Sequence, residues 1–358
     1  MIEEDPIEIA EALIASGNAG KAAQDLQARL AAGRGGLLAR LTLIKALLAA
    51  GDTGAALAQA REAVSLNSDV AVAVLALGET LLAASENNSG ALPAAIAELQ
   101  RTLRLDPDLA RARELIAAAW LKAGEADKAL ENLRMLENPP PEMLAACEAI
   151  RCAPRSDPGY VRHLFDQFSA DYDQRMIGQL AYAAPQILLD LAGLVMPGRE
   201  KLAILDVGCG TGLAGAVFKP LAARLDGVDL SPAMIEKARA RGIYDDLQVA
   251  DLQKALAAGG RAYDLILAAD TLVYLGDLEP VFRAVHRRLS PEGYFLFTVE
   301  KAEGAGFELG PKRRWRHSET YLRGLGEQTG LVLAGLVAAA PRYEANQPVK
   351  GFAVALTR

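Results

Sequence analysis

Residues 202–212, LAILDVGCGTG, decide the fold of the second half of the chain. LAILDV is a short apolar run typical of a buried strand, GCGTG is a turn, and the LAGAVFKPLA that follows has the pattern of a helix. Gly208, Gly210 and Gly212 let the backbone turn sharply and come close to a ligand, because no Cβ is in the way. The stretch therefore predicts a strand, a ligand-binding glycine loop and a helix.

Acidic residues end the strands that follow. The next apolar run, ARLDGVDL, ends in Asp229, where a carboxylate can accept both hydroxyls of a ribose. DLQVADL places Asp251 at the end of a third strand, and YDLILAADTLVYL brings Asp270 and Tyr274 to the end of a fourth. Ligands of α/β proteins bind beyond the carboxyl ends of parallel strands, so we expect these residues to meet at one edge of a Rossmann-like sheet.

A dinucleotide-dependent dehydrogenase also combines a glycine loop with an acidic residue. The loop here reads GxGxG and lacks the third glycine of the GxGxxG dinucleotide motif. The spacing therefore favours a different nucleoside-containing cofactor.

LDVGCGTG, VDLSPAMIEKAR, ADL and the aromatic-rich fourth strand resemble the class I S-adenosylmethionine-dependent methyltransferases over residues 159–358. The resemblance implies a seven-stranded α/β fold, S-adenosyl-L-methionine as cofactor, S-adenosyl-L-homocysteine as product, and no metal. It assigns Asp229 to the ribose and Asp251 to the amino edge of adenine. The full set of implied cofactor contacts is Asp206, Gly208, Cys209, Gly210, Gly212, Asp229, Leu230, Met234, Asp251, Leu252 and Tyr172.

Residues 160–192 resemble the helical lid that precedes small-molecule methyltransferase cores. In such lids an aromatic segment covers the methionyl group, which here implies roles for Phe168, Tyr172 and Tyr182. The alternative is ordinary aromatic packing.

The acceptor side of the site is predicted from chemistry. Methyl transfer from a sulfonium is an in-line displacement, and a general base is needed only when the acceptor must lose a proton. His317, which precedes a helix capped by Ser318, is the candidate base, with Tyr172 and Asp270 as further catalytic candidates. A solvated histidine and a solvated basic loop at 312–316 are the alternatives. The predicted substrate contacts are Tyr182, Tyr274, Arg314, Trp315, His317 and Tyr321.

The first part of the chain contains an internal repeat. GNAGKAAQDLQARL at Gly17, GDTGAALAQAREAV at Gly51 and GEADKALENLRML at Gly124 align as one pattern. Each unit reads as two helices that cross at a small residue, and residues 1–153 are predicted to form an all-α solenoid that ends in a capping helix. The aligned small residues are Ala22, Ala56, Ala95 and Ala129.

This pattern resembles the tetratricopeptide repeat, and Asp106-Pro107 reproduces the end of its unit. The order of repeats, lid and core resembles a bacterial group of repeat-containing methyltransferases. The resemblance implies an apolar groove that takes a protein partner. The alternatives are that the groove packs on the second domain or on a second copy, which would make a homodimer.

Composition excludes several classes. The chain of 358 residues has a net charge of -7 and no basic patch for nucleic acid. It contains no uninterrupted run of about 18 apolar residues, and its acidic start differs from a secretory signal, so we expect a cytoplasmic protein without membrane contact. The three cysteines show no CxxC spacing and the three histidines are scattered, which argues against a metal site.

Three functions follow as expectations. The first is O- or N-methylation of a small molecule, with the repeats used for assembly, partners or regulation. The second is methylation of a protein or of a carrier-bound substrate that the repeats recruit. The third is a scaffold that binds the cofactor without catalysis.

Overall fold

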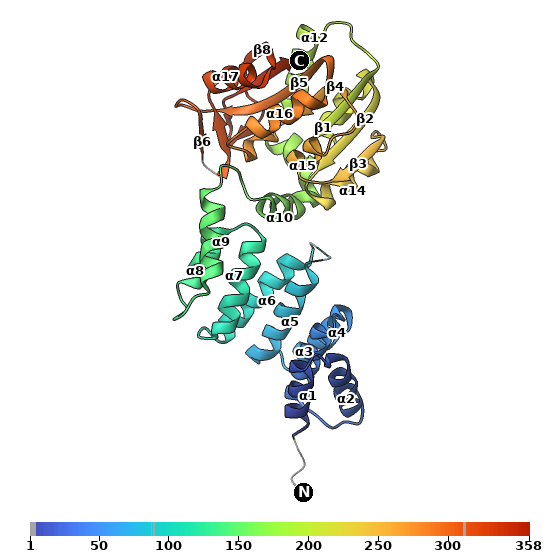
Figure 1. The fold of residues 1–358 in the computed structure, drawn as a ribbon, viewed down its shortest axis with the longest axis vertical. Coiled ribbons are helices and arrows are strands. Elements are labelled where there is room, and N and C mark those ends of the chain that lie inside the picture. Colours follow the sequence, from blue (N-terminus) through green and yellow to red (C-terminus); the bar gives the residue numbers. More distant parts are fainter. Residues whose placement is uncertain (1–4, 87, 89, 311–312) are drawn as a thin grey trace. The chain divides into compact units, whose positions relative to one another are not determined.

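The computed structural model describes residues 5–86, 88, 90–310 and 313–358. The chain divides into two compact units, Met1–Arg151 and Cys152–Arg358 (Figure 1). The division lies next to the gap between the predicted ranges 1–153 and 159–358. Each unit is described by itself.

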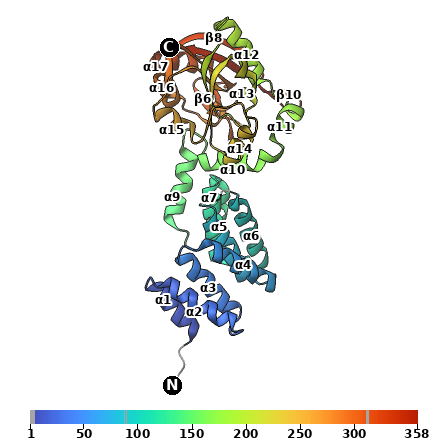
Figure 2. The ribbon, with the colours of Figure 1, turned by 90° about the vertical axis from the view of Figure 1, so that its right-hand side faces the viewer.

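The first unit is helical, as predicted. From α1 to α8 every helix contacts the next one. Helices α1, α3, α5 and α7 also contact one another in sequence (Figure 2). Its helices are α1 (Pro6–Ala15), α2 (Ala19–Ala31), α3 (Leu37–Ala49), α4 (Thr53–Leu66), α5 (Ala71–Ala84), α6 (Ala91–Leu105), α7 (Ala110–Lys122), α8 (Ala126–Leu133) and α9 (Pro141–Cys152).

The small residues that the repeat aligns lie where these helices cross. Each of them has no exposed surface. Because an alanine side chain is a single methyl group, the backbones of neighbouring helices can approach closely there. These fully buried residues are Ala22, Ala56, Ala95 and Ala129.

Gly78 of α5 gives a test of this close packing. A Cβ at Gly78 would lie 2.8 Å from Cγ of Leu99 on α6. We expect Gly78→Ala to lower the free energy of unfolding by about 1–3 kcal/mol through overpacking. Gly20 of α2 has no atom within 4 Å of such a Cβ, so Gly20→Ala should leave stability unchanged or raise it by up to about 1 kcal/mol. Urea unfolding followed by circular dichroism compares the two, and equal effects would contradict the packing.

The second unit is built on a mixed sheet with the strand order β3-β2-β1-β4-β5-β11-β8, to which β6 and β7 add at one side. Strands β1 to β5 are parallel neighbours, while β11 runs antiparallel between β5 and β8. This confirms a Rossmann-like fold. The strands are β1 (Leu202–Val207), β2 (Ala222–Asp229), β3 (Asp246–Val249), β4 (Tyr263–Ala268), β5 (Leu289–Lys301), β6 (Phe307–Leu309), β7 (Trp315–His317), β8 (Val332–Ala339) and β11 (Gly351–Thr357), with a separate hairpin of β9 (Tyr343–Glu344) and β10 (Gln347–Pro348).

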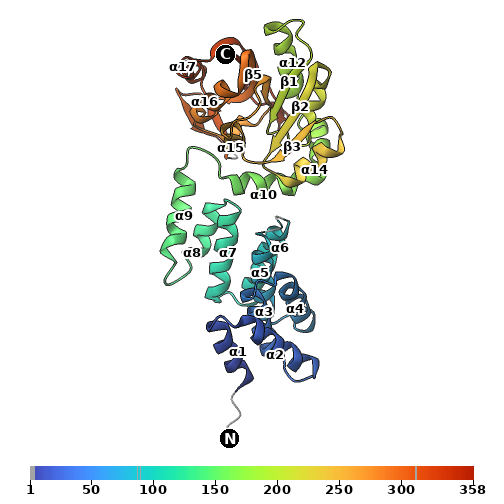
Figure 3. The same cartoon turned by 45° about the vertical axis from the view of Figure 1, so that its right-hand side comes forward.

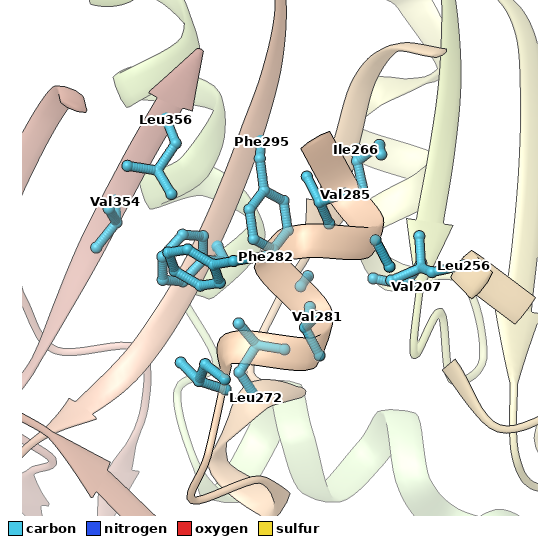
Figure 4. Close-up of a cluster of buried hydrophobic side chains, with 14 of the residues drawn as sticks. Val207, Leu256, Ile266, Leu272, Val281, Phe282, Val285, Phe295, Val354 and Leu356 are labelled. Carbon is cyan, nitrogen blue, oxygen red and sulfur yellow. The ribbon is translucent and has the colours of Figure 1, made fainter. Parts of the chain in front are cut away.

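Helices cover both faces of this sheet. Phe282 of α16 packs against Phe295 and other residues of β5, in a cluster that Figure 4 shows between the helix and the strands. On the other face α12 and α13 contribute Leu188 and Phe218 to a second cluster. The helices are α10 (Pro158–Phe168), α11 (Tyr172–Gln174), α12 (Ala184–Val195), α13 (Leu213–Phe218), α14 (Pro232–Ala240), α15 (Leu252–Ala257), α16 (Glu279–Arg288) and α17 (Glu319–Thr329).

The predicted lid begins with α10, which lies beside α14 near the ends of the strands (Figure 3). Asp157 caps α10 by accepting a hydrogen bond from the backbone N–H of Gly159 at 2.7 Å. After α11 the segment continues as a π-helix, Arg175–Gln179. Within the described part of the chain, the helices are too short or too polar to cross a membrane.

Candidate active site

The glycine loop between β1 and α13 is held against the neighbouring strand. The backbone N–H groups of Gly208 and Cys209 both donate to the carbonyl of Val228, at 2.7 and 3.0 Å. Gly208, Gly210 and Gly212 have φ angles of +71°, +56° and +92°, which favour glycine. The loop thus has the sharp turn that its sequence predicts.

Asp229, at the end of β2, fixes the other side of this loop. Its Oδ2 accepts the N–H of Gly210 and its Oδ1 accepts the N–H of Ser231, each at 2.8 Å. Burial raises the pKa of this carboxyl to about 6. A carboxylate has about four lone-pair sites, so the group can still accept a hydroxyl donor from a ligand.

A cavity opens at this edge of the sheet and brings nine of the predicted residues together. The lining includes Tyr172, Gly208, Gly210, Asp229, Leu230, Asp251, Leu252, Asp270 and Tyr274. A smaller neighbouring cavity, which shares Tyr172, Gly208 and Gly210 with the first, is also lined by Cys209 and Tyr182. The hydroxyl of Tyr182 donates to the carbonyl of Ala269 at 3.3 Å.

Asp270 lies in the wall of the larger cavity in an uncommon backbone conformation, with φ at +56°. Its N–H donates to Oγ1 of Thr298 at 2.8 Å, and its carboxylate accepts a hydrogen bond from the guanidinium of Arg342. Burial raises the pKa of Asp270, and the charge of Arg342 opposes that rise.

Arg342 is itself buried and pairs with three carboxylates. Besides Asp270, it binds Glu300 and Glu344, the last at 3.0 Å. Arg314 also pairs with Glu344. Because these carboxylates already neutralise both guanidinium groups, Arg314, a predicted substrate contact, has no unpaired positive charge to offer an anionic substrate.

Aromatic rings from the lid meet the end of β4. Phe165 of α10 packs edge-on against Tyr172 and Tyr274, with ring centroids 6.0 and 5.6 Å apart. Burial raises the pKa of both tyrosines, so they stay protonated at neutral pH. Phe168, by contrast, is 37% exposed and faces the guanidinium of Arg175.

The lid is attached to the loop and to α14 through polar contacts. Thr211 donates to Asp173 at 2.5 Å, and Arg241 pairs with the same carboxylate. Ser231 donates to Asp166 at 2.5 Å. These bonds hold the lid segment next to the cavity.

A family model matches part of the second unit. Residues 205–295 match the model described as a methyltransferase domain. This segment is therefore similar to methyltransferase domains.

Three curated relatives align with part of the chain. Methyltransferase-like protein 27 of Homo sapiens is 37% identical over 135 residues, which are 37% of this chain and 54% of that protein. Ubiquinone biosynthesis O-methyltransferase of Xanthomonas oryzae pv. oryzae is 30% identical over 122 residues, 33% of this chain and 48% of that protein. Malonyl-[acyl-carrier protein] O-methyltransferase of Acetivibrio thermocellus is 32% identical over 114 residues, 31% and 40% respectively. The chain thus spans about half the length of the curated relatives it matches.

Among solved structures, magnesium protoporphyrin IX methyltransferase from Synechocystis PCC 6803 with bound SAM is similar to this chain. The sequence identity is 18% and the TM-score 0.45, with 57% of this chain and 97% of that chain covered.

Three of the predicted cofactor residues lie outside the described lining of both cavities. Asp206 is 1% exposed and accepts the hydroxyl of Tyr244 at 2.8 Å, and burial raises its pKa to about 7. A Cβ at Gly212 would face Arg241 and Tyr244. Met234 is fully buried in α14.

His317, the predicted base, lies behind the loop that follows η4 (Leu272–Tyr274). It is fully buried in β7, its Nε2 lies 3.0 Å from the carbonyl oxygen of Gly276, and burial lowers its pKa to about 4. Tyr321 stacks on its ring, while Trp315 packs against Gly276. The described residues that line the two cavities do not include these three or Arg314.

His317 is buried because β7, the strand that carries it, pairs with β5 of the central sheet. The sequence shows the cap at Ser318, which the structure confirms by a hydrogen bond from the N–H of Tyr321 at 3.1 Å. The strand pairing was not predicted. Lys312, part of the same basic run, lies outside the described residues.

The cavity is also lined by residues that the sequence did not predict. Arg155, Phe165 and Thr271 line the cavity. Phe165 could have been found, because it belongs to the aromatic lid segment that was recognised. Arg155 had no such signal, since it lies in a segment that reads only as a linker. In the described part of the chain, we find no group of three or more histidine, cysteine or acidic side chains able to hold a metal ion.

Proposed function

We propose that this protein binds S-adenosylmethionine and transfers its methyl group to an oxygen or nitrogen of a small-molecule acceptor. The observation that carries the proposal is the meeting of the glycine loop, Asp229 and Asp251 around one cavity in a unit that is similar to methyltransferase domains. The name of the ubiquinone biosynthesis O-methyltransferase relative supports a small acceptor.

The cavity fits the parts of this cofactor. A Cβ at Gly210 would meet only the ring of Tyr172, at 4.0 Å, so the loop presents bare backbone to the cavity where a methionyl group would lie. Asp229 would hold the ribose hydroxyls. Leu230 and Leu252 supply apolar surface for a flat adenine, with Asp251 at its amino edge.

S-adenosylmethionine supplies an electrophilic methyl group on a sulfonium. The chain's own residues then align an acceptor and keep water out. Tyr172, Tyr274 and Phe165 would enclose the acceptor, since they line the cavity from the lid and the end of β4. Asp270, held by Arg342, is placed to accept a hydrogen bond from an acceptor hydroxyl or amine and to take its proton. His317 has no place in this scheme, because its ring is buried behind the cavity wall.

For the first unit we propose a tetratricopeptide-type solenoid. Its support is the chain of helix pairs that cross at buried alanines. Such a solenoid would bind a protein partner or a second copy of the chain.

A second candidate function is methylation of a carrier-bound or protein substrate that the repeats recruit. The observation that favours it is the malonyl-[acyl-carrier protein] O-methyltransferase relative. Incubation of the protein with a cell lysate and labelled S-adenosylmethionine separates the two: label in macromolecules supports the second candidate, and label in small molecules alone rejects it. A lack of any labelled product, with the cofactor bound, would instead support a non-catalytic scaffold.

Calorimetry with S-adenosylhomocysteine tests the assigned site. We expect Asp229→Ala to weaken binding at least about 100-fold, because it removes the acceptor of two hydroxyl hydrogen bonds to a charged group. Asp226→Ala is the matched control, since Asp226 is a buried carboxylate of the same strand that bonds to Tyr263. We expect its affinity to stay within about threefold of the unaltered protein.

Undiminished binding by Asp229→Ala would remove Asp229 from the site. No binding of S-adenosylhomocysteine by the unaltered chain would reject the proposed function itself.

A further inference from the structure

Arg155 and Ser156 line the cavity and belong to a short strip of residues 154–156. The carbonyl of Pro154 accepts the N–H groups of Gly276 and Asp277, at 2.9 and 3.0 Å, and the N–H of Ser156 donates to the carbonyl of Tyr274 at 2.8 Å. Arg155 forms an antiparallel bridge with Leu275. The backbone of Arg155 is therefore fixed against the loop that follows β4.

The side chain of Arg155 reaches from this loop to the one that follows β3. Its Nη2 donates to Oδ2 of Asp251 at 2.6 Å, and its Nη1 donates to the side-chain oxygen of Gln253. The side chain of Asp251 is only 9% exposed, so this is a partly desolvated pair. A planar guanidinium that binds two acceptors at once fixes both in direction.

The hydrogen bonds of Asp251 leave little freedom for a ligand. Its Oδ1 caps α15 by accepting the N–H groups of Gln253 and Lys254, at 3.1 and 3.2 Å. Its Oδ2 accepts from Arg155 and keeps one further lone pair. The carboxylate therefore offers an acceptor in one set direction, which suits an amino group and repels a carbonyl oxygen.

We propose that Arg155 is a specificity-determining residue that positions Asp251 to accept the exocyclic amino group of an adenine ring. This inference rests on the proposed function and concerns recognition of the adenine ring of the proposed cofactor by Arg155 and Asp251. Without Arg155, the cap of α15 still holds Oδ1 of Asp251, but Oδ2 loses the hydrogen bond that sets its direction, and the negative charge in the cavity is no longer compensated.

Calorimetry with two ligands tests this role without any measurement of activity. S-adenosylhomocysteine carries the amino group, while S-inosylhomocysteine has a carbonyl oxygen in its place. We expect the unaltered protein to prefer the adenine ligand at least about tenfold, since a buried acceptor is left without its donor in the other complex. We expect Arg155→Met to weaken S-adenosylhomocysteine binding about tenfold and to reduce the preference to below about threefold.

Two further variants control the result. Arg155→Lys keeps the charge but loses the two-pronged geometry, so an intermediate preference is expected. Arg224→Met removes a guanidinium that pairs with Asp226 at 2.9 Å and lies outside the described cavity lining. It should leave both affinities unchanged.

The preference between the ligands separates positioning from general stability. An unchanged preference in both Arg155 variants would overturn the inference, whether or not the affinity for both ligands falls together. Equal binding of the two ligands by the unaltered protein would also overturn it and would leave the proposed function intact. Binding of neither ligand by the unaltered protein would reject both.

Discussion

Gly208→Ala is expected to destabilise the second unit and to abolish binding of S-adenosylhomocysteine. A Cβ at this position would lie 2.3 Å from Cγ2 and 2.4 Å from Oγ1 of Thr271. The φ angle of +71° adds backbone strain, because side chains other than glycine rarely adopt it. Overpacking and strain together are expected to cost about 3–5 kcal/mol of the free energy of unfolding.

Gly198→Ala is a matched control for the strain alone. Gly198 has the same φ angle of +71°, but a Cβ there would meet nothing within 4 Å. We expect this variant to lose only about 1–2 kcal/mol and to keep its affinity for S-adenosylhomocysteine. Urea unfolding and calorimetry measure both quantities. Equal losses of stability in the two variants would show that the contact with Thr271 does not contribute to the change in the free energy of unfolding.

Gly208 also shows why part of the site could be predicted. A glycine loop and the acidic residues that end neighbouring strands are local signals, because parallel strands bring their carboxyl ends to one edge whatever the rest of the fold does. Asp229, Asp251 and Asp270 were predicted in this way and meet in one cavity. The buried alanines of the first unit follow from an equally local repeat.

Two arginines that were not predicted depend on contacts between distant parts of the chain. Arg155 contacts Asp251 across 96 positions of sequence, and Arg342 contacts Asp270 across 72. Neither arginine is marked by a motif or a period in the chain. The burial of His317 was missed for a related reason, because its ring lies in β7, whose pairing with β5 joins distant parts of the chain. Local sequence identified the strand ends, whereas side chains from distant segments complete the walls between them.

The pH dependence of stability is expected to change in Asp206→Asn. Asp206 is 1% exposed, its Oδ2 accepts the hydroxyl of Tyr244, and its Oδ1 lacks a hydrogen-bond partner among the described residues. Burial raises its pKa from 3.8 to about 7. Between about pH 4 and pH 7 the folded protein therefore holds a proton that the unfolded chain has released. The contribution of Asp206 to stability is thus lost as the pH rises through this window.

Asparagine is neutral at every pH and still offers an oxygen to Tyr244. We expect Asp206→Asn to match the unaltered protein near pH 4 and to exceed its stability at pH 8 by up to about 4 kcal/mol, from about three pKa units. Urea unfolding of the ligand-free protein at several pH values measures this difference. Burial also raises the pKa of Asp229, which adds a slope of the same sign to both proteins. The charge of Asp229 also contributes to the raised pKa of Asp206.

Asp245→Asn provides a control of opposite sign. The carboxylate of Asp245 accepts the N–H of Leu225 at 2.8 Å, and this hydrogen bond lowers its pKa. Its contribution to stability is present at neutral pH and is lost as the pH falls, so this variant should be less stable than the unaltered protein at pH 8 and should converge with it in acid. Parallel stability curves for Asp206→Asn and the unaltered protein would mean that Asp206 is ionised in the folded state throughout. The buried carboxyl of Asp206, next to the glycine loop, would then be negatively charged instead of protonated.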